Sequence, residues 1–404
     1  MVESASGHNS EYLLELDRFL SQHARWAHRR PGGRQIDFSY FDLSRMSLPG
    51  VVLSNARMTG VCLAHSNLSR ADLQAASLVM ADMESVNLSH ANLLGADLRG
   101  ACLNGANMIE ANMAGADLRI GAVANDKRPA AQRRNQSRLP SRRTELIDAN
   151  LNRALMMGAK LENCDLTGAE LVDADLSGAD LTGAILVATD LSGVTLTNAK
   201  IHGAVLCGST LDQKVIDQIA DLGGGAERSL TRIDDQLPKM LVEHKKWLES
   251  GGATGQRIEL DMVDLSGCVL SGCTLSGAKI QRSLLSEAKL NDADLIMADL
   301  AYCTLANADL TQANLSGCIL RRANLTNACL KNAILDDVPL GRDQDRPWPT
   351  NLQYARLNNC DLRWRSAGGV ILRYANLIGA QIDQNTLRTA DLQGAKLSEP
   401  KPVN

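Results

Sequence analysis

The residues best suited to chemistry in this chain are its seven histidines and ten cysteines. No two histidines have the spacing of a metal-ligating pair on a helix. The seven are His8, His23, His28, His65, His90, His202 and His244. The sequence contains no CxxC, no GxSxG and no phosphate-binding GxxxxGK[ST]. The three glycines at 223–225 lack the lysine and the strand that a phosphate loop needs. We therefore expect no enzyme activity and no cofactor.

The ten cysteines do not indicate a disulfide framework, because no secretory signal precedes them. We expect free thiols in a reducing compartment and a cytoplasmic protein. The net charge of −4 and the pI near 6.0 argue against general affinity for nucleic acid or membranes. No apolar stretch reaches the length of about 18 residues that a membrane helix needs, so we expect no membrane span.

Composition and spacing point to a repeat rather than to a compact globular core. Aromatic residues make up only 3% of the chain, whereas Leu and Ala carry much of its 45% apolar content. Leu or another apolar residue recurs with a period of five from Leu43 to Leu118, from Leu146 to Leu211, from Leu260 to Leu335 and from Leu352 to Leu397. A small residue, most often Ala, lies two positions before most of these, commonly with Asp or Asn between them.

A period of five fits neither an α-helix nor a plain strand. It fits a coil in which each five-residue unit makes one side and one corner, with the central Leu and the small residue pointing inward. Four sides make a coil of about twenty residues, and successive coils hydrogen-bond at the strand spacing of about 4.8 Å. Six cysteines occupy the small inward site, and no two of them should stack, so we interpret them as buried packing residues: Cys164, Cys268, Cys273, Cys303, Cys318 and Cys360.

The runs ADLSGADLTGA (174–184) and ANLLGADLRGA (91–101) follow the pattern A(D/N)LxG and resemble the pentapeptide-repeat family. The resemblance covers roughly three quarters of the chain. It implies an all-β fold, a right-handed quadrilateral parallel β-helix or solenoid, with Leu stacked at each level. Members of that family include quinolone-resistance proteins that bind DNA gyrase, bacterial effectors and scaffolds.

A helix that contains a histidine and a tryptophan precedes each of two repeat arrays. The end of a solenoid exposes strand edges, and an amphipathic helix over residues 10–30 is suited to cover them. His23 and Trp26 are followed by two glycines and an array, and His244 and Trp247 are followed in the same way. We infer a duplication of cap plus array, in which Trp26 and Trp247 are structural and cover the first coil. A ligand role for either histidine is the alternative.

The phases of the repeat predict the domain organisation. Each array should be one β-helix opened by a cap, and interruptions should appear where the phase shifts. The linker should hold one short helix after Leu211 and a second from Thr231 to Glu249. The predicted regions are a helical cap (1–35), β-helix 1 (36–211) with a basic loop insertion (about 124–143), a helical linker or internal cap (212–256), β-helix 2 (257–398) with a break (about 339–350) and a tail (399–404).

Two clusters of basic residues are candidate contact sites for a partner. Residues 119–144 hold eight Lys or Arg against Asp126 alone, a balance of +7. Near the C-terminus arginines adjoin a tryptophan, and both residue types are favoured at binding hot spots. The loop could instead stay solvated, and the C-terminal residues could instead pack against the phase break. The candidate contacts are Arg133, Arg134, Arg138, Arg142, Arg143, Arg363, Trp364 and Arg373.

We therefore expect a non-catalytic scaffold that presents a rigid surface to a protein partner. The alternative is a DNA mimic that binds a type II topoisomerase. Residues 145–211 hold nine acids against Arg153, Lys160 and Lys200, a balance of −6, and an acidic stripe unbroken along one face would favour this reading. A second alternative is nucleic-acid contact through the basic loop, although no aromatic residue lies among its basic ones.

Overall fold

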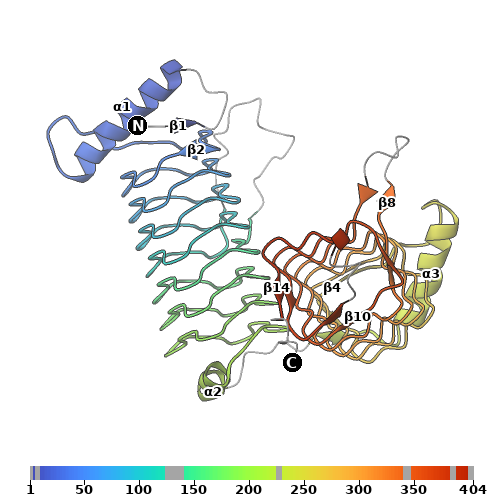
Figure 1. Cartoon of the computed structure of the whole chain (residues 1–404). Coiled ribbons are helices and arrows are strands. Elements are labelled where there is room, and N and C mark those ends of the chain that lie inside the picture. The colour runs from blue at the N-terminus through green and yellow to red at the C-terminus, as the bar shows by residue number, and fades with distance from the viewer. Residues whose placement is uncertain are drawn as a thin grey trace, which may run out of the picture. The chain divides into compact units, whose positions relative to one another are not determined.

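The computed structural model describes residues 3–4, 10–122, 141–223, 230–339, 347–382 and 388–398. The chain divides into two compact units, Met1–Arg228 (unit 1) and Ser229–Asn404 (unit 2). In each unit it winds into stacked coils, and short helices lie beside the coils (Figure 1). None of the described helices is both long and apolar enough to cross a membrane.

Parallel pairing between residues one coil apart defines the fold. Asp37 pairs with Arg57, twenty residues later, and Asp42, Ser47 and Val52 each pair with the residue twenty positions further on. Four such pairs per coil give the coil four sides. The predicted fold class, an all-β solenoid built as a four-sided parallel β-helix with short helical caps, is confirmed.

Each side of a coil has the same local structure, as the five residues from Ala96 to Gly100 show. Ala96 and Leu98 point inward and have no exposed surface. Asp97 lies between them, and its carboxylate accepts the main-chain N–H of Arg99 at 3.3 Å. Gly100 forms the corner with a φ of +67°, a conformation that glycine adopts without steric cost. One repeat therefore fills the core and stabilises the corner together.

The first phase break is an insertion into an unbroken stack. Cys102 pairs with Glu145 and Asp117 with Lys160, so the coils before and after residues 123–140 are direct neighbours. The chain leaves the stack and returns to it at an antiparallel bridge between Gly121 and Arg142.

Helices lie at both ends of the stack in unit 1. Helix α1 (Ser10–Ala27) lies at the first coil and α2 (Gln213–Asp221) at the last (Figure 1). Apolar residues of both helices join the core of the stack, namely Leu16, Leu20 and Val215. Strand β1 (Glu3–Ser4) pairs antiparallel with β2 (Met46–Ser47) on the first coil. The apolar surface and the strand edge at the first coil are thereby partly covered.

Unit 2 begins with β3 (Thr231–Arg232) and α3 (Leu237–Glu249). The predicted helix start at Thr231 is wrong, because β3 pairs in parallel with β5 (Val263–Asp264) on the first coil. Pro238 lies in the first turn of α3, where proline is tolerated. The predicted linker 212–256 is divided, since α2 packs into the core of unit 1 and α3 into that of unit 2.

The stack of unit 2 also continues across its phase break, where Ile319 pairs with Asn351. The break holds an antiparallel hairpin of β8 (Val338–Pro339) and β9 (Pro347–Trp348). The remaining strands pair in parallel between coils: β4 (Glu259–Asp261) with β6 (Lys279–Gln281), β7 (Ile334–Leu335) with β11 (Ser366–Ala367), β10 (Asp361–Leu362) with β13 (Gln381–Ile382), and β12 (Asn376–Leu377) with β14 (Lys396–Leu397).

All ten cysteines are free thiols. Of the six predicted to point inward, five are buried and Cys273 is half-buried. Burial raises the pKa of the Cys303 and Cys360 thiols to about 12, so both are protonated near neutral pH. A protonated, buried thiol is a poor nucleophile. These cysteines therefore act as packing residues.

Candidate functional site

Both caps are built on a buried histidine. His23 of α1 and His244 of α3 have no exposed surface. The main-chain N–H of Ile36 donates to Nδ1 of His23 at 3.1 Å, and that of Ile258 donates to Nδ1 of His244 at 3.1 Å. The equivalence of the two His-x-x-Trp segments therefore extends to the hydrogen bond that ties each helix to its first coil.

These hydrogen bonds require a neutral imidazole with its proton on Nε2. In His23, Nε2 lies 3.1 Å from the carbonyl oxygen of Ser54 and donates to it. In His244, Nε2 has no hydrogen-bond partner among the described residues, although the Ser276 carbonyl acts on its pKa. Burial lowers the pKa of both imidazoles, and the nearby carbonyl partly opposes this effect. Both histidines therefore act structurally, each accepting the N–H of the first coil.

Trp26 and Trp247 stack on these histidines. The ring centroids are 5.4 Å apart in the first cap and 5.7 Å apart in the second, with interplanar angles of 23° and 11°. Both tryptophans are half-buried. We propose that they stiffen the caps by holding the imidazoles in place. Within the described ranges, no cluster of His, Cys, Asp or Glu could hold a metal ion.

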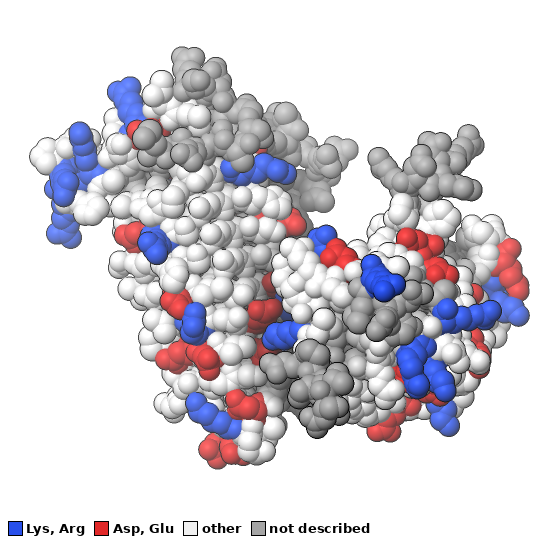
Figure 2. All heavy atoms as spheres, in the orientation of Figure 1, with Lys and Arg blue, Asp and Glu red and all other residues white. Residues whose placement is uncertain are grey.

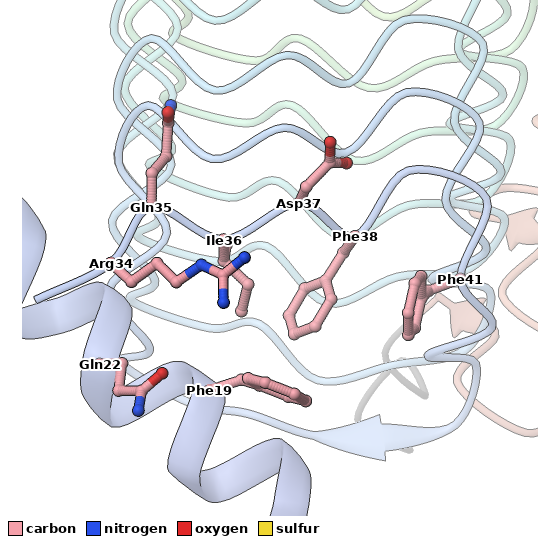
Figure 3. Close-up of a pocket in the computed structure, with 8 residues that line it drawn as sticks. All are labelled: Phe19, Gln22, Arg34, Gln35, Ile36, Asp37, Phe38 and Phe41. Atoms are coloured by element: carbon pink, nitrogen blue, oxygen red, sulfur yellow. The ribbon is translucent and has the colours of Figure 1, made fainter.

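A groove lies between α1 and the first coil of unit 1. Phe19 extends from α1 toward Phe38 and Phe41 of the coil, whereas Gln35 and Asp37 point away from the helix (Figure 3). Phe19 and Phe41 are 40% and 46% exposed, and Phe38 is 2% exposed. The groove has a volume of about 270 Å³ and is lined by Phe19, Gln22, Arg34, Gln35, Ile36, Asp37, Phe38 and Phe41. Its floor is therefore aromatic and its rim is open to solvent.

Unit 2 has a groove in the equivalent place, with a different lining. Met240 precedes His244 by four residues, as Phe19 precedes His23, and Glu243 takes the place of Gln22. No aromatic residue is among those that line it, which are Asp235, Gln236, Lys239, Met240, Glu243, Gln256, Arg257 and Ile258. The fold therefore closes a first coil without phenylalanine.

The two caps also differ in net charge. Residues 22–37 hold four bases against one acid, a balance of +3: Arg25, Arg29, Arg30 and Arg34 against Asp37. The equivalent residues 243–259 hold three of each, a balance of 0: Lys245, Lys246 and Arg257 against Glu243, Glu249 and Glu259. Figure 2 shows a group of Lys and Arg side chains at the end of unit 1 where α1 lies.

The two caps also differ in the ion pairs that their basic residues form. In unit 2 each base of residues 243–259 has an acidic partner: Lys245 with Glu249, Lys246 with Glu243 and Arg257 with Glu259. In unit 1 the four cap arginines are exposed, and none forms an ion pair with another described residue. Sequence reasoning overlooked this site. The signal was available in the run HRRPGGR at 28–34, directly after the cap helix.

Two of the contact residues predicted in the basic loop, Arg142 and Arg143, lie among the described residues. Arg133, Arg134 and Arg138 lie outside the described residues. Arg142 is half-buried, and its guanidinium donates to the carbonyl oxygens of Gly100 at 2.7 Å and Ala81 at 3.2 Å. We correct its assignment, because these bonds join Arg142 to the main chain of its own stack. Arg143 is exposed.

The C-terminal cluster also needs one correction. Trp364 is 7% exposed and belongs to the core of unit 2, so it is not on the contact surface. The five-residue period continues past this point, since Asp361 pairs with Cys329 and Ser366 with Ile334, but the residues between depart locally from the repeat and leave Trp364 buried and Arg365 exposed. Arg363 and Arg373 are exposed, and they form ion pairs with Asp361 and Asp391.

An aromatic stack lies next to Arg373. Tyr374 stacks on Tyr354 with ring centroids 5.0 Å apart and an interplanar angle of 11°. The guanidinium of Arg322 lies 4.5 Å from the Tyr354 ring centroid. These three residues occupy the same corner position of successive coils, so the stack follows the coil spacing. Both faces of Tyr354 are therefore occupied within the chain.

Exposed apolar residues gather on one side of unit 1. Leu94, Leu155 and Met157 occupy outward positions where the repeat usually has a polar residue, and they are 38%, 42% and 42% exposed. Main-chain hydrogen bonds place Leu94 and Met157 on the coils directly before and after Ala114. Leu155 pairs with Asn112 on the neighbouring coil. We call Leu94, Ala114, Leu155 and Met157 the apolar strip.

Acidic residues do not form an unbroken stripe in the columns of paired residues. One column of unit 1 reads Asp97, Asp117, Lys160, Asp180 and Lys200, and its acids alternate with bases after two coils. In the paired columns of the described residues, acids occupy no more than two successive coils. The arrangement that would favour DNA mimicry is therefore not present in these columns.

A family model for pentapeptide repeats matches the sequence in eight copies. The matched residues are 34–70, 66–105, 144–183, 174–213, 264–300 and 298–337, more than half of the chain. No curated protein matches the sequence.

Several solved structures are similar to this chain. HetL, a pentapeptide repeat protein from the cyanobacterium Nostoc sp. strain PCC 7120, is 18% identical over 94% of this chain and 96% of its own, with a TM-score of 0.20. QnrB1, a plasmid-mediated fluoroquinolone resistance protein, is 20% identical over 47% of this chain and 93% of its own, with a TM-score of 0.24. Rfr23 from the cyanobacterium Cyanothece 51142 is 24% identical over 34% of this chain and 88% of its own, with a TM-score of 0.18.

Proposed function

Because the chain belongs to the pentapeptide-repeat family, we propose that it is a non-catalytic scaffold that presents a rigid surface to other proteins. The stacked Leu and Ala side chains fill the interior and fix the main chain, so outward residues are free to vary. In a molecule of this design, recognition depends on outward side chains that the fold does not need.

The apolar strip is the observation that carries this proposal. Single exposed apolar residues are common on protein surfaces, whereas contiguous ones mark interaction sites. Leu94 lies two coils before Leu155 and Met157 with Ala114 between, and all three large residues are at outward positions where a polar residue would serve the fold equally well. Their presence is therefore explained by a partner that covers them.

Affinity capture tests the proposal. The full chain is used as bait in nuclease-treated lysate of its source organism, and the captured proteins are identified by mass spectrometry. A bait with Leu94→Ser and Met157→Ser should lose specific partners. A bait with Val269→Ser, an exposed apolar residue in unit 2, should keep them. Recovery of the same proteins with both baits would contradict the role of the strip.

The exposed arginines predicted from the sequence stay proposed contacts. Arg143, Arg363 and Arg373 are accessible to a partner. Alanine variants of each in the same capture experiment should lose a subset of partners if these side chains take part in binding. Unchanged capture by all three variants would remove them from the contact surface.

Topoisomerase binding through DNA mimicry is less well supported, because the paired columns mix acids and bases. Type II topoisomerase subunits among the captured proteins would promote it over a general scaffold. Nucleic-acid contact through the basic loop predicts steeply salt-dependent binding that is lost when residues 124–143 are deleted.

A further inference from the structure

We infer that the groove beneath α1 in unit 1 binds an acidic segment of another protein, which inserts one apolar side chain between Phe19, Phe38 and Phe41. The inference rests on the proposed scaffold function and names the chemistry of one partner. It comes from the difference between the two caps and from the charge around the groove.

The distribution of phenylalanine is the first argument. The chain of 404 residues contains three phenylalanines, and all three line this groove. The fold does not require them, because the equivalent groove of unit 2 lies over a closed first coil without any aromatic residue. Phe19 and Phe41 stay 40% and 46% exposed, at the cost of apolar surface in water. A ligand that covers these rings explains their concentration at one place.

Charge defines the ligand. Arg34 lines the groove, Arg25 lies in the last turn of α1, and Arg29 and Arg30 lie between these two in sequence; none of the four forms an ion pair with a described acid. Among the described residues that line the groove Asp37 is the one acid, and its carboxylate points away from α1 and accepts the N–H of Ser39 (Figure 3). In unit 2 the bases of the equivalent residues 243–259 are paired with acids of the same segment. Complementarity therefore favours a partner segment rich in Asp or Glu.

Shape favours a protein segment over other anions. The volume of about 270 Å³ lies just below the range of small-molecule pockets and suits one inserted side chain. Phe38 and Phe41 are tilted by 47° with centroids 5.4 Å apart, and Phe38 is nearly buried. They offer no flat pair of ring faces on which nucleic-acid bases could stack. A peptide with one apolar side chain and flanking carboxylates fits both the concave shape of the groove and the positive charge of its cap.

The test selects ligands for the full chain from a displayed library of random short peptides. Binding of the enriched sequence, made as a labelled synthetic peptide, is then measured by fluorescence anisotropy. We expect the selected peptides to combine Asp or Glu with one aromatic or large aliphatic residue. Phe19→Ser and Phe41→Ser should each weaken binding by about tenfold or more, as for a central apolar contact. The double variant Arg29→Ser with Arg30→Ser should weaken it about fivefold at low salt and little at high salt.

Matched variants in unit 2 serve as controls. Met240→Ser and Val263→Ser lie at the equivalent positions of the second cap and should leave the affinity unchanged. Hydrogen exchange of the Ile36 amide should stay slow in Phe19→Ser and Phe41→Ser, which shows that the cap has kept its His23 bond. Loss of binding is then assigned to the groove.

Several results would overturn the inference. One is the selection of basic peptides. Another is the selection of peptides that bind the Phe19→Ser and Phe41→Ser variants as tightly as the unchanged chain, and a third is that no peptide is enriched. Binding of oligothymidylate or of phosphatidylserine vesicles with the same dependence on Phe41 would assign the groove to nucleic acid or to membrane. If peptide selection fails while capture still depends on Leu94 and Met157, the groove assignment is wrong and the scaffold function stands.

Discussion

The cap of unit 1 and the cap of unit 2 perform the same structural task with different surfaces. Both tie a helix to the first coil through a buried histidine, at His23 and His244, and both stack a tryptophan on it. Around these shared contacts, the cap of unit 1 has phenylalanines and arginines without ion pairs among the described residues, whereas the cap of unit 2 has ion pairs. What the two caps share is required for closing a solenoid end, and what they do not share is available for recognition.

The largest loss of stability should come from substitutions in the interiors, which are the part of the structure that the two units share most fully. Leu98→Lys in unit 1 and Leu300→Lys in unit 2 each place an unpaired charge between coils and should cost about 4 kcal/mol or more of local stability. Gln74→Lys and Val269→Lys, at exposed positions, should change stability by less than about 0.5 kcal/mol. Hydrogen exchange monitored by mass spectrometry measures both. Equal stability of inward and outward variants would refute the assigned phase of the repeat.

The next effect distinguishes the two histidines. His23→Ala leaves the buried N–H of Ile36 without an acceptor and should destabilise the first cap by about 3 kcal/mol. His244→Ala should cost less, about 2 kcal/mol, because the Ser276 carbonyl near its Nε2 does not form a hydrogen bond of normal geometry, whereas Nε2 of His23 donates to Ser54. Exchange rates of the Ile36 and Ile258 amides report each cap separately, with Arg18→Ala as a surface control. A larger loss for His244 would reverse this part of the comparison.

The third effect depends on pH. Burial lowers the pKa of both imidazoles, so the folded caps bind a proton less readily than the unfolded chain, whose histidines titrate near about 6.5. Cap stability should be constant above that pH and should fall as the pH drops below it, by at most about 1.4 kcal/mol per unit for each histidine. His23→Asn keeps an acceptor for Ile36 and cannot titrate. It should remove the acid sensitivity of the first cap and leave that of the second, as measured by exchange rates corrected for intrinsic pH dependence.

The smallest effect tests whether charge alone makes a binding site. Glu243→Gln with Glu249→Gln breaks two exposed ion pairs and gives the second cap a positive balance like that of the first. Stability should change by less than about 1 kcal/mol, because exposed pairs contribute little. The double variant should still not bind the peptide selected on the first groove, since Met240 replaces Phe19 there. Binding at this cap, measured by anisotropy with Phe41→Ser as background, would show that charge suffices.

The interior of the molecule could be predicted because its rules are local. A residue such as Leu98 points inward because it is central in its own five-residue unit, whatever lies elsewhere in the chain. The cap helix and its two apolar residues, Leu16 and Leu20, follow in the same way from helical spacing within α1. Periodicity therefore determined the fold class, the core and the positions of the caps.

The surfaces could not be predicted, because they depend on which coils become neighbours. Leu94 and Met157 lie in one column, on either side of Ala114, because the stack bypasses the insertion that separates them in sequence. Trp364, expected on the surface, is buried because the coil departs locally from the repeat between Leu362 and Ser366. Arg142, expected to meet a partner, is bound to the carbonyls of Gly100 and Ala81 across coils.

The sequence by itself determined that this protein is a stacked, four-sided solenoid with two histidine-bearing caps, since a five-residue period leaves one way to bury Leu and Ala. Only the tertiary structure decided that Phe19, Phe38 and Phe41 share one groove with Arg34, which forms no ion pair with a described residue. Helix and coil must first be joined through His23 before residues so far apart in sequence can form one surface.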